Sequence, residues 1–179
     1  SVMPGYVPVA MLGDQLPVLD EAVVAGLVAV EETRVGFRHE LVRLAVEQGL
    51  PPGLRQTLHT EVLQLLRRGG QPEPALLAFH ARQAHDQDLA FSSDRAAAER
   101  AVALGAHREA AAHYRRALSL GRRLLDKFPD HKKVHKIRKQ LPTILENAEI
   151  EERQEEEQRI QGFIKTKRFQ DAVELSEAL

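Results

Sequence analysis

Two neighbouring segments with small residues at helical spacing constrain the fold of this chain most. Alanines recur on both sides of Gly105-Ala106, at Ala97, Ala98, Ala101, Ala110, Ala111 and Ala117. Side chains this small let two helices approach closely, and glycine readily ends a helix and turns the chain. We therefore predict a helical hairpin with helices over about Ser93–Leu104 and His107–Leu125. Tyr114, between Ala110 and Ala117, stands at a spacing typical of tetratricopeptide-like repeats.

Helical spacing of apolar residues continues on both sides of this hairpin. Helices are expected after Pro17, over 39–49, 54–68, 74–84 and 143–163, and from Phe169 onward, with a basic helix after Asp130 that Pro142 either kinks or ends. Asp86 to Asp88 is expected to break the chain between two helices. Alternation from Val28 to Phe37, around a Glu-Glu-Thr turn, predicts a short β-hairpin as the only strand pair. Residues 1–16 are expected to be irregular.

The composition of the chain changes abruptly between Asp126 and Lys127. Residues 1–126 hold 14 arginines and 20 alanines but no lysine and no isoleucine, whereas residues 127–179 hold seven lysines, five isoleucines and three alanines. A solvated helix accepts either cation, so folding does not require this change. We interpret it as a junction between two ancestral pieces, natural or engineered, within about Leu118 to Lys127. This position is called the compositional junction below.

The net charge, the lengths of the apolar runs and the absence of cysteine limit where the protein can be located and what it can bind. The formal net charge is −1, which implies no general attraction to nucleic acid or to an anionic membrane. The longest apolar runs are too short to span a bilayer, and the N-terminus lacks the basic region of a signal peptide. Without cysteine there is no disulfide framework and no thiolate chemistry. We therefore expect a cytoplasmic protein with no membrane partner.

Three ordered motifs carry a family resemblance. They are GFRHELVR, LPPGLRQTLH and GAHREAAAHYRRAL, which begin at Gly36, Leu50 and Gly105. Over about residues 19–120 the chain resembles the middle of LuxR-type transcriptional regulators with a STAND-class nucleotide-binding module. The resemblance implies the end of a winged-helix-like segment over residues 18–66, with 28–37 as its wing, and the first helices of a tetratricopeptide-like arm over 74–120. Residues 127–179 resemble tetratricopeptide-like sequence of unrelated origin, as in a chimera.

These observations together predict a mainly α protein. A stack of tetratricopeptide-like helical hairpins is expected to follow an N-terminal winged-helix-like unit that contains one short β-hairpin. We expect the winged-helix-like unit over residues 1–70 and the helical-hairpin region over 71–126. A Lys- and Glu-rich helical segment of different compositional origin is expected over 127–179.

The sequence has no constellation typical of catalysis or cofactor binding. The G-x-x-x-x-G-K-[ST] loop that cradles phosphates is missing, as is the DNA-reading helix-turn-helix of the resembled regulators. Glu155, Glu156 and Glu157 lie among Gln and Arg, whereas a catalytic carboxyl needs a pocket that tunes it. We therefore expect a non-enzyme without a cofactor, to which neither ATP hydrolysis nor promoter binding carries over.

Histidine pairs are the only candidates for metal binding. His131 and His135 stand four residues apart beside Asp130, a spacing that can ligate a divalent transition metal. The alternative is a solvated basic face, because lysines at 132, 133 and 136 repel a cation and no third ligand is evident. His80 and His85 are five residues apart and do not share a helix face. We predict no metal site.

A basic cluster precedes an acidic run in the last third of the chain. Lys132, Lys133, Lys136, Arg138 and Lys139 could contact a phosphate backbone, but no aromatic residues are interleaved with them. The acidic run Glu149 to Glu157 follows, so we interpret the cluster as one half of a charge pairing within or between helices. No nucleic-acid partner is expected in this chain.

The remaining candidates are interaction residues. Arg38 and His39 either contact a partner, as the resemblance implies, or serve the start of a helix, with Arg38 paired to a carboxylate. Tyr114 belongs either to the repeat core or to a ligand contact. Phe169, Val173 and Leu175 are expected to form an uncovered face that pairs two copies, because Leu179 follows without a polar cap.

Two hypotheses on function remain from the sequence. One is a non-catalytic helical-repeat module, derived from the regulatory arm of a bacterial transcriptional regulator, that binds a protein or a peptide. The alternative is an engineered or chimeric helical scaffold with no evolved function.

Overall fold

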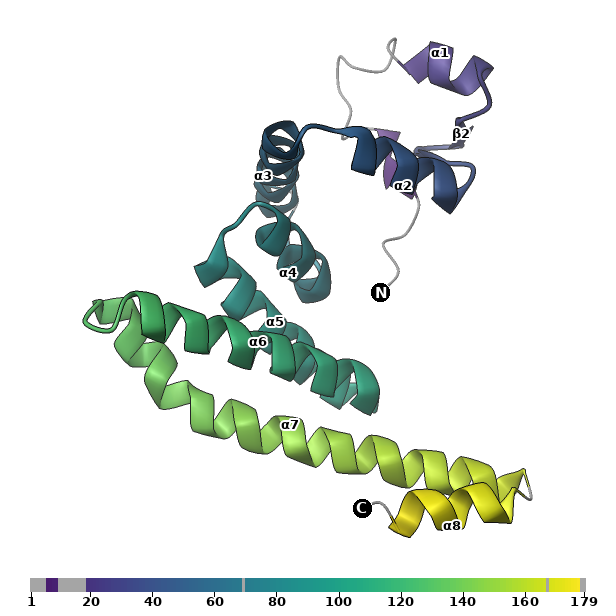
Figure 1. The fold of residues 1–179 in the computed structure, drawn as a ribbon. Helices are drawn as coiled ribbons and strands as arrows, with labels where there is room; N and C mark the ends of the chain where they lie inside the picture. The colour runs from purple at the N-terminus through teal and green to yellow at the C-terminus, as the bar shows by residue number, and fades with distance from the viewer. Residues whose placement is uncertain (1–5, 10–18, 69, 167, 178–179) are drawn as a thin grey trace. The chain divides into compact units, whose positions relative to one another are not determined.

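The structure is a computed structural model that describes residues 6–9, 19–68, 70–166 and 168–177 (Figure 1). Internal contacts divide the chain into two compact units, Ser1–Gln71 and Pro72–Leu179. The compositional junction therefore lies inside the second unit and not between units. Within the described residues, no helix combines the length and the apolar character needed to cross a bilayer.

The first unit combines a small antiparallel sheet with helices. Its described elements are β1 (Tyr6–Pro8), α1 (Leu19–Val24), β2 (Val28–Glu31), β3 (Arg34–Phe37), α2 (Glu40–Gly49) and α3 (Pro52–Arg68). The strands are ordered β1-β3-β2, so β3 is central. The predicted β-hairpin is confirmed, with Val28 opposite Phe37 and Glu31 opposite Arg34. The side chains of Val28 and Val35 are buried and belong to the small core of this unit.

Strand β1 corrects the prediction that the lead-in is irregular. Tyr6 pairs with Gly36 and Pro8 with Arg34. A three-residue strand that ends at a proline shows no alternation in sequence, and its extended conformation depends on the free edge of β3. The expectation of a single strand pair was therefore wrong at this edge. The rest of the predicted lead-in, residues 1–5 and 10–16, lies outside the described residues.

The second unit is a succession of helices in which each packs on the next. Its elements are α4 (Pro74–Gln83), α5 (Gln87–Ala103), α6 (His107–Lys127), α7 (Lys132–Lys165) and α8 (Phe169–Glu177). Helix α6 packs against both α5 and α7, α4 packs on α5, and α8 packs on α7 (Figure 1). The predicted fold class, mainly α with helical hairpins and one β-hairpin near the N-terminus, is confirmed.

Two helix boundaries in this unit differ from the predictions. Helix α5 begins at Gln87 and not near Ser93, because Asp86 acts as an N-cap whose side chain accepts a hydrogen bond from Leu89 N at 3.1 Å. The acidic segment starts a helix where a break was predicted. Helix α7 continues through Pro142 to Lys165, so this proline does not begin a new helix.

Three turns between helices of the second unit share one backbone geometry. Each closes with a hydrogen bond from an amide to the carbonyl five residues earlier: Asp86 to Ala81 at 2.9 Å, Ala106 to Ala101 at 2.9 Å, and Arg168 to Phe163 at 2.8 Å. This is the 6→1 bond of a Schellman helix end. In each case the residue four positions later is a buried alanine, namely Ala90, Ala110 and Ala172. The same turn therefore recurs on both sides of the compositional junction.

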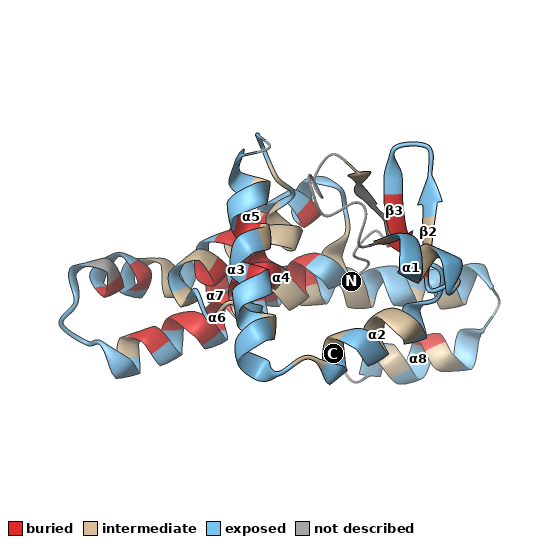
Figure 2. Ribbon diagram, turned by 90° about the horizontal axis from the view of Figure 1, so that it is seen from above, coloured by how far each residue is buried: buried red, intermediate tan, exposed pale blue. Residues whose placement is uncertain are grey.

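The core of the second unit changes in character along the chain. Between α4, α5 and α6 it consists mainly of alanines with Phe91 and Tyr114, whereas between α6 and α7 it consists of larger aliphatic residues such as Leu118, Ile137 and Ile144. Buried residues accordingly form stripes along α4 to α7, while exposed residues dominate the outer helix faces (Figure 2).

Candidate functional site

A groove lies between α6 and α7. Its walls are held by close packing around Gly121, on the inner face of α6. A Cβ placed on Gly121 would lie 2.6 Å from Leu141 Cδ2 and 3.1 Å from both Ile137 Cγ2 and Phe91 Cε2. The absence of a side chain at this position thus sets how closely α7 approaches α6.

Polar contacts across the compositional junction fix the register of these two helices. His107 Nδ1 donates to Glu151 Oε2 at 2.6 Å, with both side chains largely buried. Asn147 Nδ2 donates to the Tyr114 hydroxyl at 3.4 Å. Side chains that precede the compositional junction therefore pair with side chains that follow it.

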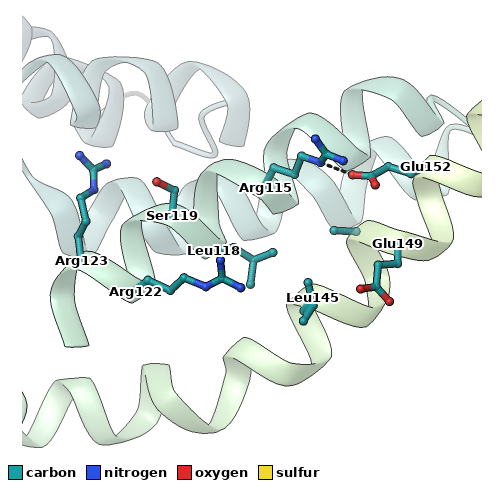
Figure 3. Close-up of a pocket in the computed structure, with 9 residues that line it drawn as sticks. Arg115, Leu118, Ser119, Arg122, Arg123, Leu145, Glu149 and Glu152 are labelled. Carbon is teal, nitrogen blue, oxygen red and sulfur yellow. Dashed lines mark hydrogen bonds and ion pairs between the residues drawn. The ribbon is translucent and has the colours of Figure 1, made fainter. Parts of the chain in front are cut away.

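The groove lies between α6 and α7 beside these contacts. It has a volume of about 490 Å³ and an apolar floor of Leu118, Leu145 and Ala148. Its other lining residues are Arg115, Ser119, Arg122, Arg123, Glu149 and Glu152 (Figure 3). Leu145 is 39% exposed at the edge, whereas Ala148 is buried beneath it. The volume lies within the range of about 300–1,000 Å³ that is typical of ligand pockets.

Charge in the groove is divided between its walls. All three cations come from α6 and both carboxylates come from α7. Arg115 donates to Glu152 at one end, and this hydrogen bond raises the pKa of the Arg115 guanidinium. Figure 3 shows Arg122 extended along the groove toward Leu118, while Arg123 points away from it. Within the described part of the chain, neither Arg122 nor Arg123 pairs with a carboxylate.

Two smaller grooves lie on other faces of the second unit. One, of about 290 Å³, lies between α5 and α7 and includes Phe91, Arg95 and Lys136. The other, of about 240 Å³, lies between α4, α5 and α6 and includes Arg82 and His85. Arg82 is already held by Asp94, and the second arginine of this groove, Arg123, also lines the rim of the α6–α7 groove.

Asp94 forms a buried ionic cluster that is structural. Its carboxylate has no exposed surface, and Arg82 Nη1 contacts its two oxygens at 2.8 and 2.7 Å. His113 Nδ1 donates to Oδ1 at 2.8 Å, and Arg116 Nη1 lies 4.0 Å from the same oxygen. Since every partner comes from α4 or α6, the cluster ties these helices to α5. Its contacts are satisfied internally, which leaves no donor aimed at a ligand.

The candidate metal-binding histidines lie in α4 or α7 or directly beside these helices. His131 precedes α7 and His135 lies in its first turns, both exposed. Among the described residues, no group of three or more His, Cys, Asp or Glu side chains converges as a metal site. His80 is buried in α4 and His85 stands in the following turn with a φ of 62°.

The predicted interaction residues are distributed over both units. In the first, Arg38 and His39 are exposed, and His39 occupies the N-cap position of α2 without a side-chain hydrogen bond to the helix. Arg38 pairs with no carboxylate among the described residues. In the second unit, Tyr114 is only 3% exposed, and burial raises its pKa. Its position is that of a core residue.

The predicted interaction residues of α8 are more exposed than Tyr114. Phe169 is 59% exposed and Val173 is 53% exposed on α8, while Leu175 is half-buried. Pairing of two copies through this face stays a prediction, since the contacts within one chain do not address it.

The basic cluster and the acidic run belong to the single helix α7, where Lys132 and Glu151 are separated by about 28 Å of helix length at 1.5 Å per residue. The acidic run contacts α6, through Glu151 to His107 and Glu152 to Arg115, and pairs within α7 through Glu155 to Arg159. A charge pairing of the basic cluster within or between helices stays a prediction.

Sequence reasoning missed the α6–α7 groove. One signal was available, because Arg115, Ser119 and Arg122 follow one face of a helix at i, i+4 and i+7, with Leu118 beside them. The sequence did not predict the opposite wall of the groove, because no local signal places Leu145 and Glu149 of α7 against this face of α6.

Comparisons with known proteins do not assign the chain to a family: no family model, curated protein or solved structure matches it.

Proposed function

We propose that the protein is a non-catalytic helical-repeat module that binds a protein or peptide segment, derived from the regulatory arm of a bacterial transcriptional regulator. The α6–α7 groove is the observation that carries the binding part. It combines an apolar floor, a free edge at Leu145 and charged walls on helices that are packed on both sides. Peptide sites commonly join a hydrophobic pocket to a few polar groups on a rigid scaffold.

The origin of the module is supported by the three motifs that resemble LuxR-type regulators with a STAND-class module. They fall on α2, α3 and α6, and the third motif covers the turn and first helix turns that precede the groove. A cytoplasmic location goes with this origin. Pairing of two copies through Phe169, Val173 and Leu175 is a further part of the proposal, and light scattering at high concentration tests it.

Selection from a random displayed-peptide library tests the binding function. The immobilised chain should enrich a common sequence motif over blank resin. Leu145→Lys places a charge at the groove edge and should abolish that enrichment. Leu104→Lys is the matched control, because Leu104 is 74% exposed at the end of α5 and outside the groove. If neither the original chain nor the control enriches any motif, the proposed function is wrong.

A second candidate, a chimeric scaffold without an evolved partner, is favoured by the compositional junction. It predicts an abrupt change of GC content and codon usage between codons 118 and 128 of the gene. A coding sequence that is uniform through this region would contradict it. The matched side chains across α6 and α7 fit either origin, because selection for folding alone can produce them.

A further inference from the structure

Resting on the proposed function, we infer that the α6–α7 groove selects an acidic peptide segment, one that inserts a large aliphatic side chain beside a carboxylate received by Arg122. The proposal concerns the chemistry of the partner and not its name. Three features of the groove lead to it: its size, its uneven charge and the position of Arg122.

The size of the groove limits the anchor. Within a groove of about 490 Å³, only Leu118, Leu145 and Ala148 form the apolar floor, which is too short for the continuous apolar stripe of a long helix. The apolar floor is short, because Arg115 and Glu152 close one end of it with their ion pair. A short segment with one main anchor is therefore the occupant that fits.

The charge of the groove determines which residues should flank that anchor. Arg115 and Glu152 neutralise each other, which leaves Arg122 on the α6 wall facing the carboxylate of Glu149 on the α7 wall. Arg123 lines the groove only at its rim and points away from it, so the free positive charge lies on the α6 wall, at Arg122. A segment with carboxylates is complementary to it, and one with lysines on the α6 side is not.

The position of Arg122 makes it the main receptor for a carboxylate. Its guanidinium extends along the groove toward the apolar floor, whereas Arg123 points away (Figure 3). A planar guanidinium can hold a carboxylate through two parallel hydrogen bonds, beside an aliphatic side chain that lies on Leu118. Glu149, on the opposite wall, repels the same carboxylate and limits how tightly a purely acidic segment binds.

An oriented peptide library tests this chemistry. In it a central leucine is constant and two positions on each side are random, and the composition of the bound fraction is measured for the full chain. The expected result is enrichment of Asp and Glu at one or more flanking positions. Arg122→Glu should remove this enrichment or convert it to Lys and Arg. Arg68→Glu, with the same change in net charge at an exposed residue at the end of α3, should leave it unchanged.

Fluorescence anisotropy with the most enriched acidic peptide then provides magnitudes. Arg122→Glu should weaken its binding about tenfold, as expected for loss of a hydrogen bond to a charged group. Glu149→Gln should strengthen binding, an effect that general damage to the fold would not produce. Circular dichroism spectra should be the same for all variants, because both residues are exposed.

The outcomes separate this inference from the proposed function. A bound fraction without acidic preference, or an acidic preference that Arg122→Glu does not alter, would overturn the inference while a groove-dependent motif still supports peptide binding. Absence of any motif in the random library removes the proposed function itself, and this inference with it.

Discussion

Two helix interfaces of the second unit both join neighbouring helices, but they are built from different kinds of side chain. Helices α5 and α6, both before the compositional junction, meet through alanines around the fully buried carboxylate of Asp94. Helices α6 and α7, on its two sides, meet through larger aliphatic residues against Gly121, with polar contacts at the margins. The turns that precede α6 and α8 nevertheless have the same backbone geometry. Hairpin geometry therefore does not depend on one kind of core.

The comparison also indicates where each interface is vulnerable. A buried carboxylate with several cationic partners is sensitive to loss of its charge, whereas aliphatic packing on a glycine is sensitive to added volume. The open groove lies beside the second interface, where Leu145 is partly exposed.

Loss of the Asp94 charge should have the largest effect. Asp94→Ala leaves Arg82 and His113 without their shared carboxylate, and breaking a buried ion pair in this way costs about 3–5 kcal/mol. Urea denaturation of the chain should show this loss in its free energy of unfolding. The control is Glu99→Gln, which removes only the exposed ion pair with Arg95 and should cost less than about 1 kcal/mol. Equal effects of the two changes would mean that the cluster does not hold α4, α5 and α6 together.

Added volume at Gly121 should have the next largest effect. Gly121→Ala places a Cβ against Leu141, Ile137 and Phe91, and we expect a net loss of about 1–2 kcal/mol in the free energy of unfolding. Gly162→Ala is the matched control, since a Cβ at Gly162 in α7 meets no atom within 4 Å. That change should stabilise the chain by up to about 1 kcal/mol through helix propensity. Stabilisation by both changes would show that α7 does not approach α6 as closely as described.

Ionisation of Tyr114 should produce a smaller effect that depends on pH. Burial raises the pKa of its hydroxyl above 10.0, so its contribution to stability is complete below the unfolded pKa and is lost as the pH rises through the folded pKa. Denaturation midpoints of the original chain and of Tyr114→Phe should differ little at pH 8. At pH 11 the original chain should lose more stability than the variant does. Parallel pH profiles would indicate that the Tyr114 ring is not buried in the core of the second unit.

The ion pair between Arg115 and Glu152 should contribute least. Arg115 is 67% exposed and Glu152 is 29% exposed, so water screens the pair. A double-mutant cycle with Arg115→Ala and Glu152→Ala should give a coupling energy of about 0.2–1 kcal/mol, and salt should reduce it. A coupling energy of several kcal/mol would mean that surface charge, and not Gly121, joins the helices across the compositional junction.

Much of the helical architecture could be predicted because it depends on local signals. Gly105 and the small residues around it predicted the α5–α6 hairpin, and Val28 to Phe37 predicted the β-hairpin of the first unit. The start of α5 was missed because Asp86 can either break or cap a helix. Strand β1 was missed because only the edge of β3 makes residues 6–8 extended.

The candidate site was less predictable than the fold. Tyr114 was singled out with its core role as one alternative, and its 3% exposure places it in the core. The contacts of Glu151 and Glu152 with α6 were not predicted, because the sequence does not tell which helix lies beside α7. Arg122 and Leu145 were not singled out, since each is unremarkable until α6 and α7 bring them to one groove.

The sequence by itself determined the kind of local structure, because helix periodicity, turn residues and β-alternation act over a few neighbouring residues. It also showed that the chain changes composition after Asp126. Only the tertiary structure decided that helices on the two sides of this change share a core at Gly121 and enclose a groove between oppositely charged walls. The physical reason is that burial and charge pairing depend on which distant residues come into contact. The same helical periodicity is compatible with many different packings of one helix against another.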